Sequence, residues 1–233
     1  MNTHEQIAAN LETIRQRIAQ AAARSGRSMD EITILGASKA QPQESLHAAF
    51  AAGLRVFGEN RVQEALAMME SLPDEIEWHL IGPLQSNKVK KVVPAFAAVH
   101  SIDRLKIARV LDREATALGK PMLGMIEVNL AGEDSKHGFL PGALLEHLPA
   151  LRDLESLTVS GLMAIPPYEA DPQDSRKWFR QLRELRDEVF SRDGWSERAG
   201  YLSMGMSQDY GVAVEEGATH VRIGTALFGP RGG

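Results

Sequence analysis

The segment ITILGASK, residues 32–39, determines how the rest of the chain is interpreted. Its first seven residues, Ile32–Ser38, are mostly apolar and rich in β-branched side chains, which predicts a buried β-strand. Lys39 follows at the carboxyl end of that strand, where α/β folds collect their chemistry. A lysine in a loop is ordinarily a solvated surface residue. Lys39 is therefore a candidate Schiff-base former only if the remaining sequence supplies a matching site.

Short apolar segments alternate with helical patterns along the whole chain. Besides the first, the expected strands are Leu54–Gly58, Glu77–Gly82, Ala97–Ser101, Met122–Leu130, Leu157–Ala164, Tyr201–Met204 and His220–Gly224. The expected helices are Thr3–Ser25, Gln43–Ala52, Arg61–Ser71, Gln85–Val93, Asp103–Leu118, Pro141–Leu151, Asp174–Phe190 and Ser207–Glu216. Asp103 and Asp174 are expected as N-caps, whereas Gly53, Gly119 and Gly217 mark helix ends.

Eight strands separated by helices indicate one (β/α)8 TIM barrel spanning residues 1–233, an α/β fold with an extra helix within residues 1–28 packed on it. The length of 233 residues is close to the ~250 typical of such barrels. A doubly wound open sheet is the alternative. Its edge strands would carry prolines or inward charges, which these segments lack, so closure is favoured.

Composition excludes several classes of protein. The chain has no Cys, which removes disulfides, thiolate nucleophiles and Cys-based metal sites and suits a reducing cytoplasm. We expect no metal centre, no membrane span and no export signal. A net charge of −5 argues against nucleic-acid binding. The local basic cluster Lys88, Lys90 and Lys91 is expected to be a solvated helix face.

The last two expected strands are followed by loops suited to an anion. In SMGMSQD, Ser203–Asp209, Ser207 is expected to open a helix, and in RIGTALFG, Arg222–Gly229, Gly224 and Thr225 offer amides and a hydroxyl. Barrels frequently bind phosphate between the loops after strands seven and eight. The alternative is that these residues only form turns and cap helices. Two such loops across the barrel mouth from Lys39 favour the phosphate site.

A phosphorylated aldehyde requires both an amine and a phosphate site, and pyridoxal 5′-phosphate (PLP) is the common example. Lys39 would hold it as an internal aldimine. If Arg222 faces the pyridine nitrogen, its guanidinium only donates, so that nitrogen stays an unprotonated acceptor. The alternative for Arg222 is a salt bridge to Glu127 or another acid inside the barrel.

Seven motifs in consistent order resemble the pyridoxal phosphate homeostasis protein family: ASK, FGEN, WHLIGPLQSNK, HSID, GLMAIPP, LSMGMSQD and VRIGTALFG. The resemblance covers nearly the whole chain after the first helix. It implies a monomeric barrel similar to the N-terminal domain of alanine racemase, of fold-type III, with PLP bonded to Lys39. By position it also implies that Ser207, Gly224 and Thr225 hold the phosphate, that Arg222 faces the ring nitrogen, and that Asn60, Met204 and His79 line the ring.

Two functions from different classes follow. The family resemblance implies a PLP carrier that buffers the cofactor, takes part in vitamin B6 homeostasis and hands PLP to apo-enzymes, without an established catalytic activity. The alternative is a PLP-dependent amino-acid racemase or decarboxylase. A racemase that transfers protons on both faces of the cofactor needs an acid or base opposite Lys39. The sequence offers Tyr168, in a Pro-rich loop, or the histidines His79 and His100. Histidines inside barrel strands are more commonly core residues than catalysts. The carrier is the favoured function.

Overall fold

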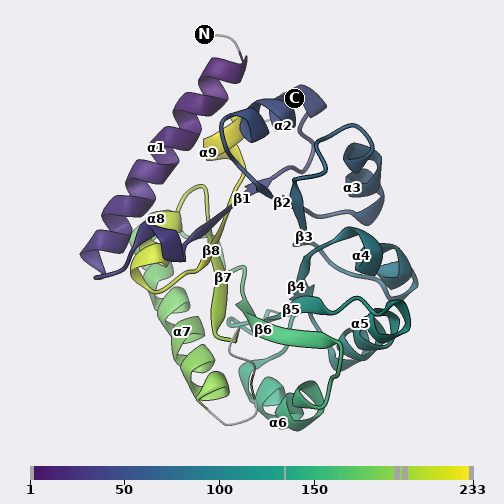
Figure 1. Ribbon diagram of the computed structural model, residues 1–233. Coiled ribbons are helices and arrows are strands. Elements are labelled where there is room, and N and C mark those ends of the chain that lie inside the picture. The colour runs from purple at the N-terminus through teal and green to yellow at the C-terminus, as the bar shows by residue number, and fades with distance from the viewer. Residues whose placement is uncertain (1–2, 134, 192–194, 196–198, 231–233) are drawn as a thin grey trace.

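The computed structural model describes residues 3–133, 135–191, 195 and 199–230. Eight parallel strands form a closed barrel in which each strand pairs with the next along the chain and β8 pairs with β1 (Figure 1). The strands are β1 (Thr33–Ala37), β2 (Val56–Glu59), β3 (Glu77–Leu80), β4 (Ala98–Ile102), β5 (Met122–Glu127), β6 (Leu157–Met163), β7 (Tyr201–Met206) and β8 (His220–Ile223). The predicted barrel is confirmed, and the open sheet is excluded.

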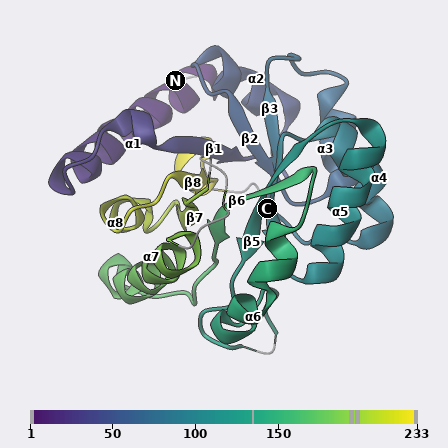
Figure 2. The same ribbon diagram turned by 60° about the horizontal axis from the view of Figure 1, so that its bottom comes forward.

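The helices surround the barrel, as Figure 2 shows from a second direction. They are α1 (Thr3–Arg24), α2 (Gln43–Ala51), α3 (Val62–Met69), α4 (Val89–Ala95), α5 (Leu105–Leu118), α6 (Pro141–Arg152), α7 (Arg176–Phe190), α8 (Tyr210–Glu215) and α9 (Thr225–Phe228). Short 3-10 turns, η1 (Met29–Glu31), η2 (Ser86–Lys88) and η3 (Pro172–Ser175), precede β1, α4 and α7. In the part of the chain described, no helix is long and apolar enough to cross a bilayer.

The first helix packs along the outside of the barrel beside the closure between β8 and β1. Its buried residues Ile7, Leu11, Ile14 and Ile18 recur at helical spacing, so they form one apolar stripe. That stripe packs on α2, α8 and α9 (Figure 1). Burying these side chains removes apolar area from water, the dominant favourable term in folding.

The main hydrophobic core lies between the strands and the surrounding helices. Outward-facing strand residues such as Ile126 and Leu162 pack there with helix residues such as Leu111 and Leu182. In α7 the side chains of Phe179, Leu182, Leu185 and Val189 are buried in this core, but that of Trp178 is not. Trp178 instead lies at the helix surface, where its indole donates to Glu169.

The expected N-caps are wrong, because the chain begins these helices later. Arg104 is the N-cap of α5, while Asp103 binds the guanidinium of Arg104. Ser175 is the N-cap of α7, because the 3-10 turn η3 is inserted before it, and Asp171 caps that turn by accepting from the amide of Gln173. The prediction that three glycines mark helix ends is confirmed. Gly53, Gly119 and Gly217 all adopt a positive φ at or just after the end of a helix.

Candidate functional site

A cavity of about 310 Å³ opens at the carboxyl ends of the strands, and we call it the upper cavity. It brings together six of the eight residues expected from the sequence to form the site: Lys39, Asn60, Ser207, Arg222, Gly224 and Thr225. The side chains that complete its lining are Ala37, Gln41, Ile81, Ile165, Met206 and Gln208. An amine, a guanidinium, hydroxyls and amides therefore share one opening with a few apolar groups.

Lys39 is positioned by a tightly bonded strand end. The preceding Ser38 donates its hydroxyl to the carbonyl of Gly58 at 3.0 Å and to Oε1 of Glu59 at 2.7 Å, which ties the ends of β1 and β2 together. Ala40, directly after the lysine, has a φ of 59°, the only positive φ of a non-glycine residue in the described chain. Such backbone strain is concentrated at functional sites. Lys39 itself is exposed at the cavity and forms no hydrogen bond or ion pair with a described residue.

Asn60 reaches the same opening because two loops approach each other closely. The oxygen Oε2 of Glu59 accepts the amide of Asn60 at 2.9 Å. A side chain at Gly82 would place its Cβ 2.4 Å from the carbonyl oxygen of Asn60, so only glycine fits there. Burial raises the pKa of Glu59, although the hydrogen bond from Ser38 acts to lower it. The carboxyl group therefore serves the junction of β1 and β2 and is turned away from the opening.

The loops after β7 and β8 are joined through one hydroxyl. Oγ of Ser207 accepts from the backbone amides of Gly224 and Ala226, both at 3.1 Å. Ser207 does not open a helix, contrary to expectation, because α8 begins only at Tyr210. Thr225 does begin a helix, the short α9, with its side chain exposed. Ser207, Gly224 and Thr225 are therefore adjacent on one side of the upper cavity, across two neighbouring loops.

Met206 takes the place at the cavity that the family resemblance implied for Met204. Ser203 pairs with His220 and Met206 with Arg222, so β7 has an additional residue relative to β8, which is a β-bulge. Gly205 lies inside this bulge with a φ of 91°. As a result Met206 faces the cavity, whereas Met204 is fully buried among the helices. Met206, rather than Met204, therefore lines the upper cavity, and the isolated glycine in the strand was the available signal for the bulge.

Arg222 lies at the bottom of the upper cavity and is held by its neighbours rather than by a salt bridge. Its Nη1 donates to the carbonyl and to Oγ of Ser203, both at 2.7 Å, and its Nη2 donates to the carbonyl of Ala164 at 2.9 Å. No carboxylate of the described chain pairs with it, so the alternative pairing with Glu127 is not formed. Burial lowers the pKa of Arg222 to about 10, which leaves it charged at neutral pH. Of its five N–H groups, two remain without a protein partner.

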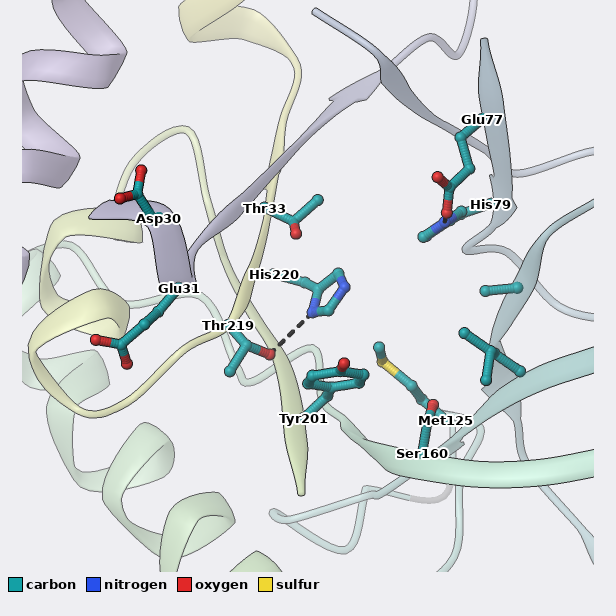
Figure 3. A pocket seen from close by; sticks show the side chains of 12 residues that line it. Asp30, Glu31, Thr33, Glu77, His79, Met125, Ser160, Tyr201, Thr219 and His220 are labelled. Carbon is teal, nitrogen blue, oxygen red and sulfur yellow. Dashed lines mark hydrogen bonds and ion pairs between the residues drawn. The ribbon is translucent and has the colours of Figure 1, made fainter. Parts of the chain in front are cut away.

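His79 belongs to a second cavity at the amino-terminal end of the barrel, about 520 Å³ in volume, which we call the lower cavity. Figure 3 shows His79 beside Glu77 there, facing the same space as His220 and Tyr201. The expectation that His79 lines the site of Lys39 is therefore wrong. Its strand position was inward, as assumed, but the ring lies on the amino-terminal side of the barrel interior.

A chain of hydrogen bonds crosses the barrel from the lower cavity to Arg222. Oε1 of Glu77 lies 2.8 Å from Nε2 of His79, and Nδ1 of His79 lies 2.9 Å from Nε2 of His100. Nδ1 of His100 is 2.8 Å from Oγ of Ser203, the hydroxyl that accepts from Arg222. Burial lowers the pKa of His100 well below its ordinary value, so its ring is neutral. The barrel interior is therefore polar along its axis and is satisfied by internal partners.

The donor and acceptor order of this chain follows from its two ends. Arg222 only donates, so the single proton of the Ser203 hydroxyl is available to Nδ1 of His100. His100 then carries its proton on Nε2 and donates to His79. With Glu77 ionised and accepting, His79 donates to it from Nε2; this bond lowers the pKa of Glu77. The sequence did not indicate this arrangement, because it depends on inward-facing side chains of four strands, β3, β4, β7 and β8.

Among the carboxyl groups of the described residues, Glu127 has the pKa that is shifted furthest from its ordinary value. It lies at the carboxyl end of β5, and burial together with the negative charge of Asp103 raises its pKa to about 7, although His137 and Arg222 oppose this. Its side chain does not line the upper cavity. Glu127 therefore adds a titratable group near the site without contacting the opening.

Comparison with known proteins is consistent with this geometry. Residues 4–232 match the family described as alanine racemase, N-terminal domain. The pyridoxal phosphate homeostasis protein of Aquifex aeolicus is 45% identical over 222 residues, which cover 95% of this chain and 96% of that protein. The protein of the same name from Escherichia coli K12 is 40% identical over 232 residues, covering 97% of each chain.

Solved structures show the same barrel. PipY of Synechococcus elongatus with PLP bound has a TM-score of 0.84 and 38% identity, covering 96% of this chain and all of that one. An alanine racemase of Clostridium difficile has a TM-score of 0.72 at 15% identity, and this chain covers 58% of it, so that likeness concerns the fold alone. The chain belongs to the pyridoxal phosphate homeostasis protein family, within the larger alanine racemase N-terminal-domain family.

Proposed function

We propose that the protein binds PLP in the upper cavity and carries it as part of intracellular PLP homeostasis. One observation supports this most directly: Lys39, which has no partner among the described residues, shares a single cavity with the joined loops of Ser207 and Gly224 and with Arg222. Relatives over the whole chain are named for PLP homeostasis, and PipY was solved with PLP bound.

The lining residues fit the groups of this cofactor. The hydroxyls of Ser207 and Thr225 suit a phosphate, which barrels frequently bind between these two loops, and the amide of Gly224 orients the Ser207 hydroxyl by donating to it. The two free N–H groups of Arg222 suit an acceptor such as the pyridine nitrogen. Asn60 with Met206 offers a polar and an apolar surface for the ring. A cavity of about 310 Å³ falls within the range of small-molecule sites.

Bound PLP would supply an aldehyde that condenses with a primary amine. The role of the chain is then to hold and present it. Lys39 provides the nitrogen of the covalent bond, the loops after β7 and β8 fix the phosphate end, and Arg222 keeps the ring nitrogen an acceptor. An unprotonated ring is a weak electron sink, which favours holding the cofactor over turning over an amino acid.

The proposal extends to the setting in which the protein acts. It places the protein in the cytoplasm as a monomer that hands PLP to apo forms of PLP-dependent enzymes, without catalysis of its own. Ile165, Tyr168 and Met206 are large apolar side chains exposed on or near the open end of the barrel, which leaves that end accessible to another molecule.

Three measurements test this proposal. The purified protein mixed with PLP should show a visible absorption band that borohydride removes, and digestion should locate the reduced adduct on Lys39. The Lys39→Ala variant should show neither, and an unchanged band in that variant would refute the covalent assignment.

Transfer to an apo-enzyme no faster than from free PLP would refute delivery. Exchange of the α-proton of an amino acid in heavy water, far faster than with free PLP, would refute the non-catalytic role.

A further inference from the structure

A second cavity of about 430 Å³ lies beside the upper cavity, and we call it the flanking cavity. It is lined by Lys39, Asn60, Arg61, Val62, Gln63, Pro83, Gln85 and Lys88. Lys39 and Asn60 line both cavities, so they form the boundary between them. Whatever binds in the flanking cavity therefore lies next to the amine to which the proposed function assigns PLP.

The charges that line the flanking cavity are all positive. Lys39, Arg61 and Lys88 contribute three cations, and no carboxylate is among the lining residues. Lys88 is half-buried, and its side chain has no hydrogen bond or ion pair with a described residue. Arg61 is bonded to Glu64 at 2.8 Å, an exposed pair worth little in stability and open to exchange for another anion.

Neutral hydrogen-bonding groups accompany these cations. Gln63 and Gln85 are exposed and Asn60 is half-buried, and none of the three side chains bonds to another described residue. The buried carboxyl of Glu59 is turned to Ser38 and to the amide of Asn60, and it does not line the cavity. The cavity thus offers cations and amides to an anion, and the carboxylate of Glu64, which pairs with Arg61, lies outside its lining.

The local fold holds these groups in place. Arg61 is the N-cap residue of α3, and Lys88 ends the turn η2 just before α4. The close approach of Gly82 to Asn60 brings the loops after β2 and β3 together, so residues from both loops face one space. Lys88 was expected from the sequence to lie on a solvated helix face with Lys90 and Lys91, but of these three lysines only Lys88 lines the cavity.

We propose that the flanking cavity is a subsite for the carboxylate of an α-amino acid, with Lys88 and Arg61 as its charged partners. An amino acid carries its amine one carbon from its carboxylate, so a carboxylate held here presents that amine towards Lys39. This inference rests on the proposed function for its purpose, because an amine at that position reaches the proposed place of the PLP aldehyde. The binding of the anion itself requires no PLP.

The test uses the full-length protein without PLP, so that it is independent of the proposed function. Three probes are titrated into isotope-labelled protein while the side-chain amide signals of Asn60, Gln63 and Gln85 are followed by NMR. The probes are L-alanine, propionate, which lacks the amine, and alaninamide, which lacks the carboxylate. L-Alanine should shift these signals with saturation, and propionate should do so at least as strongly, because it carries no ammonium group for the Lys39 cation to repel. Alaninamide should not shift them.

Variants assign the effect to the cavity. Lys88→Gln should weaken L-alanine binding about fivefold, the upper range for an ion pair that solvent still reaches. Lys88→Arg should retain binding. Lys90→Gln removes the same charge from the exposed face of α4 and should change nothing. Equal binding of L-alanine to Lys88→Gln and the unmodified protein would overturn the proposal, as would equal binding of alaninamide and L-alanine.

A parallel measurement separates this inference from the proposed function. PLP should give the same absorption band with Lys88→Gln as with the unmodified protein. Loss of that band in Lys88→Gln would overturn the inference, because the cavity would then hold part of PLP itself. Absence of a band with every form, together with charge-dependent L-alanine binding, would refute the proposed function and leave the anion subsite standing.

Discussion

Replacing Glu127 by Gln should change how the stability of the protein depends on pH. Burial and the charge of Asp103 raise the pKa of Glu127 from its ordinary 4.5 to about 7. Below pH 4.5 the carboxyl is protonated in both the folded and the unfolded chain, so it has no effect. As pH rises to 7 the unfolded chain ionises first, and the folded state loses stability relative to it.

The magnitude follows from the same shift. A rise from 4.5 to about 7 corresponds to about 3 kcal/mol lost between pH 4.5 and pH 8, since each pKa unit is worth 1.36 kcal/mol. The side chain is only 8% exposed, so solvent screening reduces this figure little. Glu127→Gln keeps the shape and a neutral polar end, and it should therefore be up to about 3 kcal/mol more stable than the unmodified protein at pH 8 and about equal at pH 4.5.

Urea unfolding at a series of pH values measures this effect. Subtracting the unfolding free energies of the two proteins at each pH removes the contribution of every other group that titrates alike in both, so that only the effect of Glu127 remains. Glu146→Gln, an exposed position on α6, serves as the matched control and should give a difference that does not vary with pH by more than a few tenths of a kcal/mol. Parallel stability curves for Glu127→Gln and the unmodified protein would refute the reasoning.

Three further variants test the barrel interior, the bulge in β7 and the helix α8. Ser203→Ala removes a partner of Arg222 and leaves Nδ1 of His100 unbonded at a fully buried position, so it should cost about 1–3 kcal/mol in urea unfolding; an unchanged midpoint would contradict the hydrogen-bond chain. Gly205→Ala should destabilise by at least about 1–3 kcal/mol, because its φ is 91° and the new Cβ would lie 2.5 Å from another methyl group. Gly211→Ala in α8 meets nothing within 4 Å and should stabilise by up to about 1 kcal/mol, so thermal shifts of the same sign for both glycines would contradict the assignment.

Local patterns were sufficient for the elements and for much of the candidate site. Among the described residues, all eight strands and eight of the nine α-helices lie where periodicity and glycine stops predicted them, apart from shifts at their ends. The short α9 was missed, because four residues carry no recognisable helical period. Six of the eight site residues meet in the upper cavity because parallel strands deliver their carboxyl ends to one rim.

Some predicted positions differ from the structure for physical reasons that a sequence pattern does not reveal. The family resemblance placed Met204 at the site by position, but the bulge at Gly205 turns Met206 into the cavity instead. It placed His79 there in the same way, but the ring of His79 lies at the amino-terminal end of the barrel interior. The N-caps failed because Arg104 and the turn η3 shift the helix starts by one residue or more.

By itself, the sequence determined the barrel, the place of Lys39 at the end of the first strand and the pair of glycine-containing loops, since these depend on near neighbours along the chain. Only the tertiary structure decided what surrounds them. It gave Arg222 backbone and hydroxyl partners in place of Glu127, linked Glu77 to Ser203 through two histidines, and placed Lys88 beside Lys39. These contacts join residues from different strands and loops, and their distances are fixed by closure of the barrel rather than by spacing in the chain.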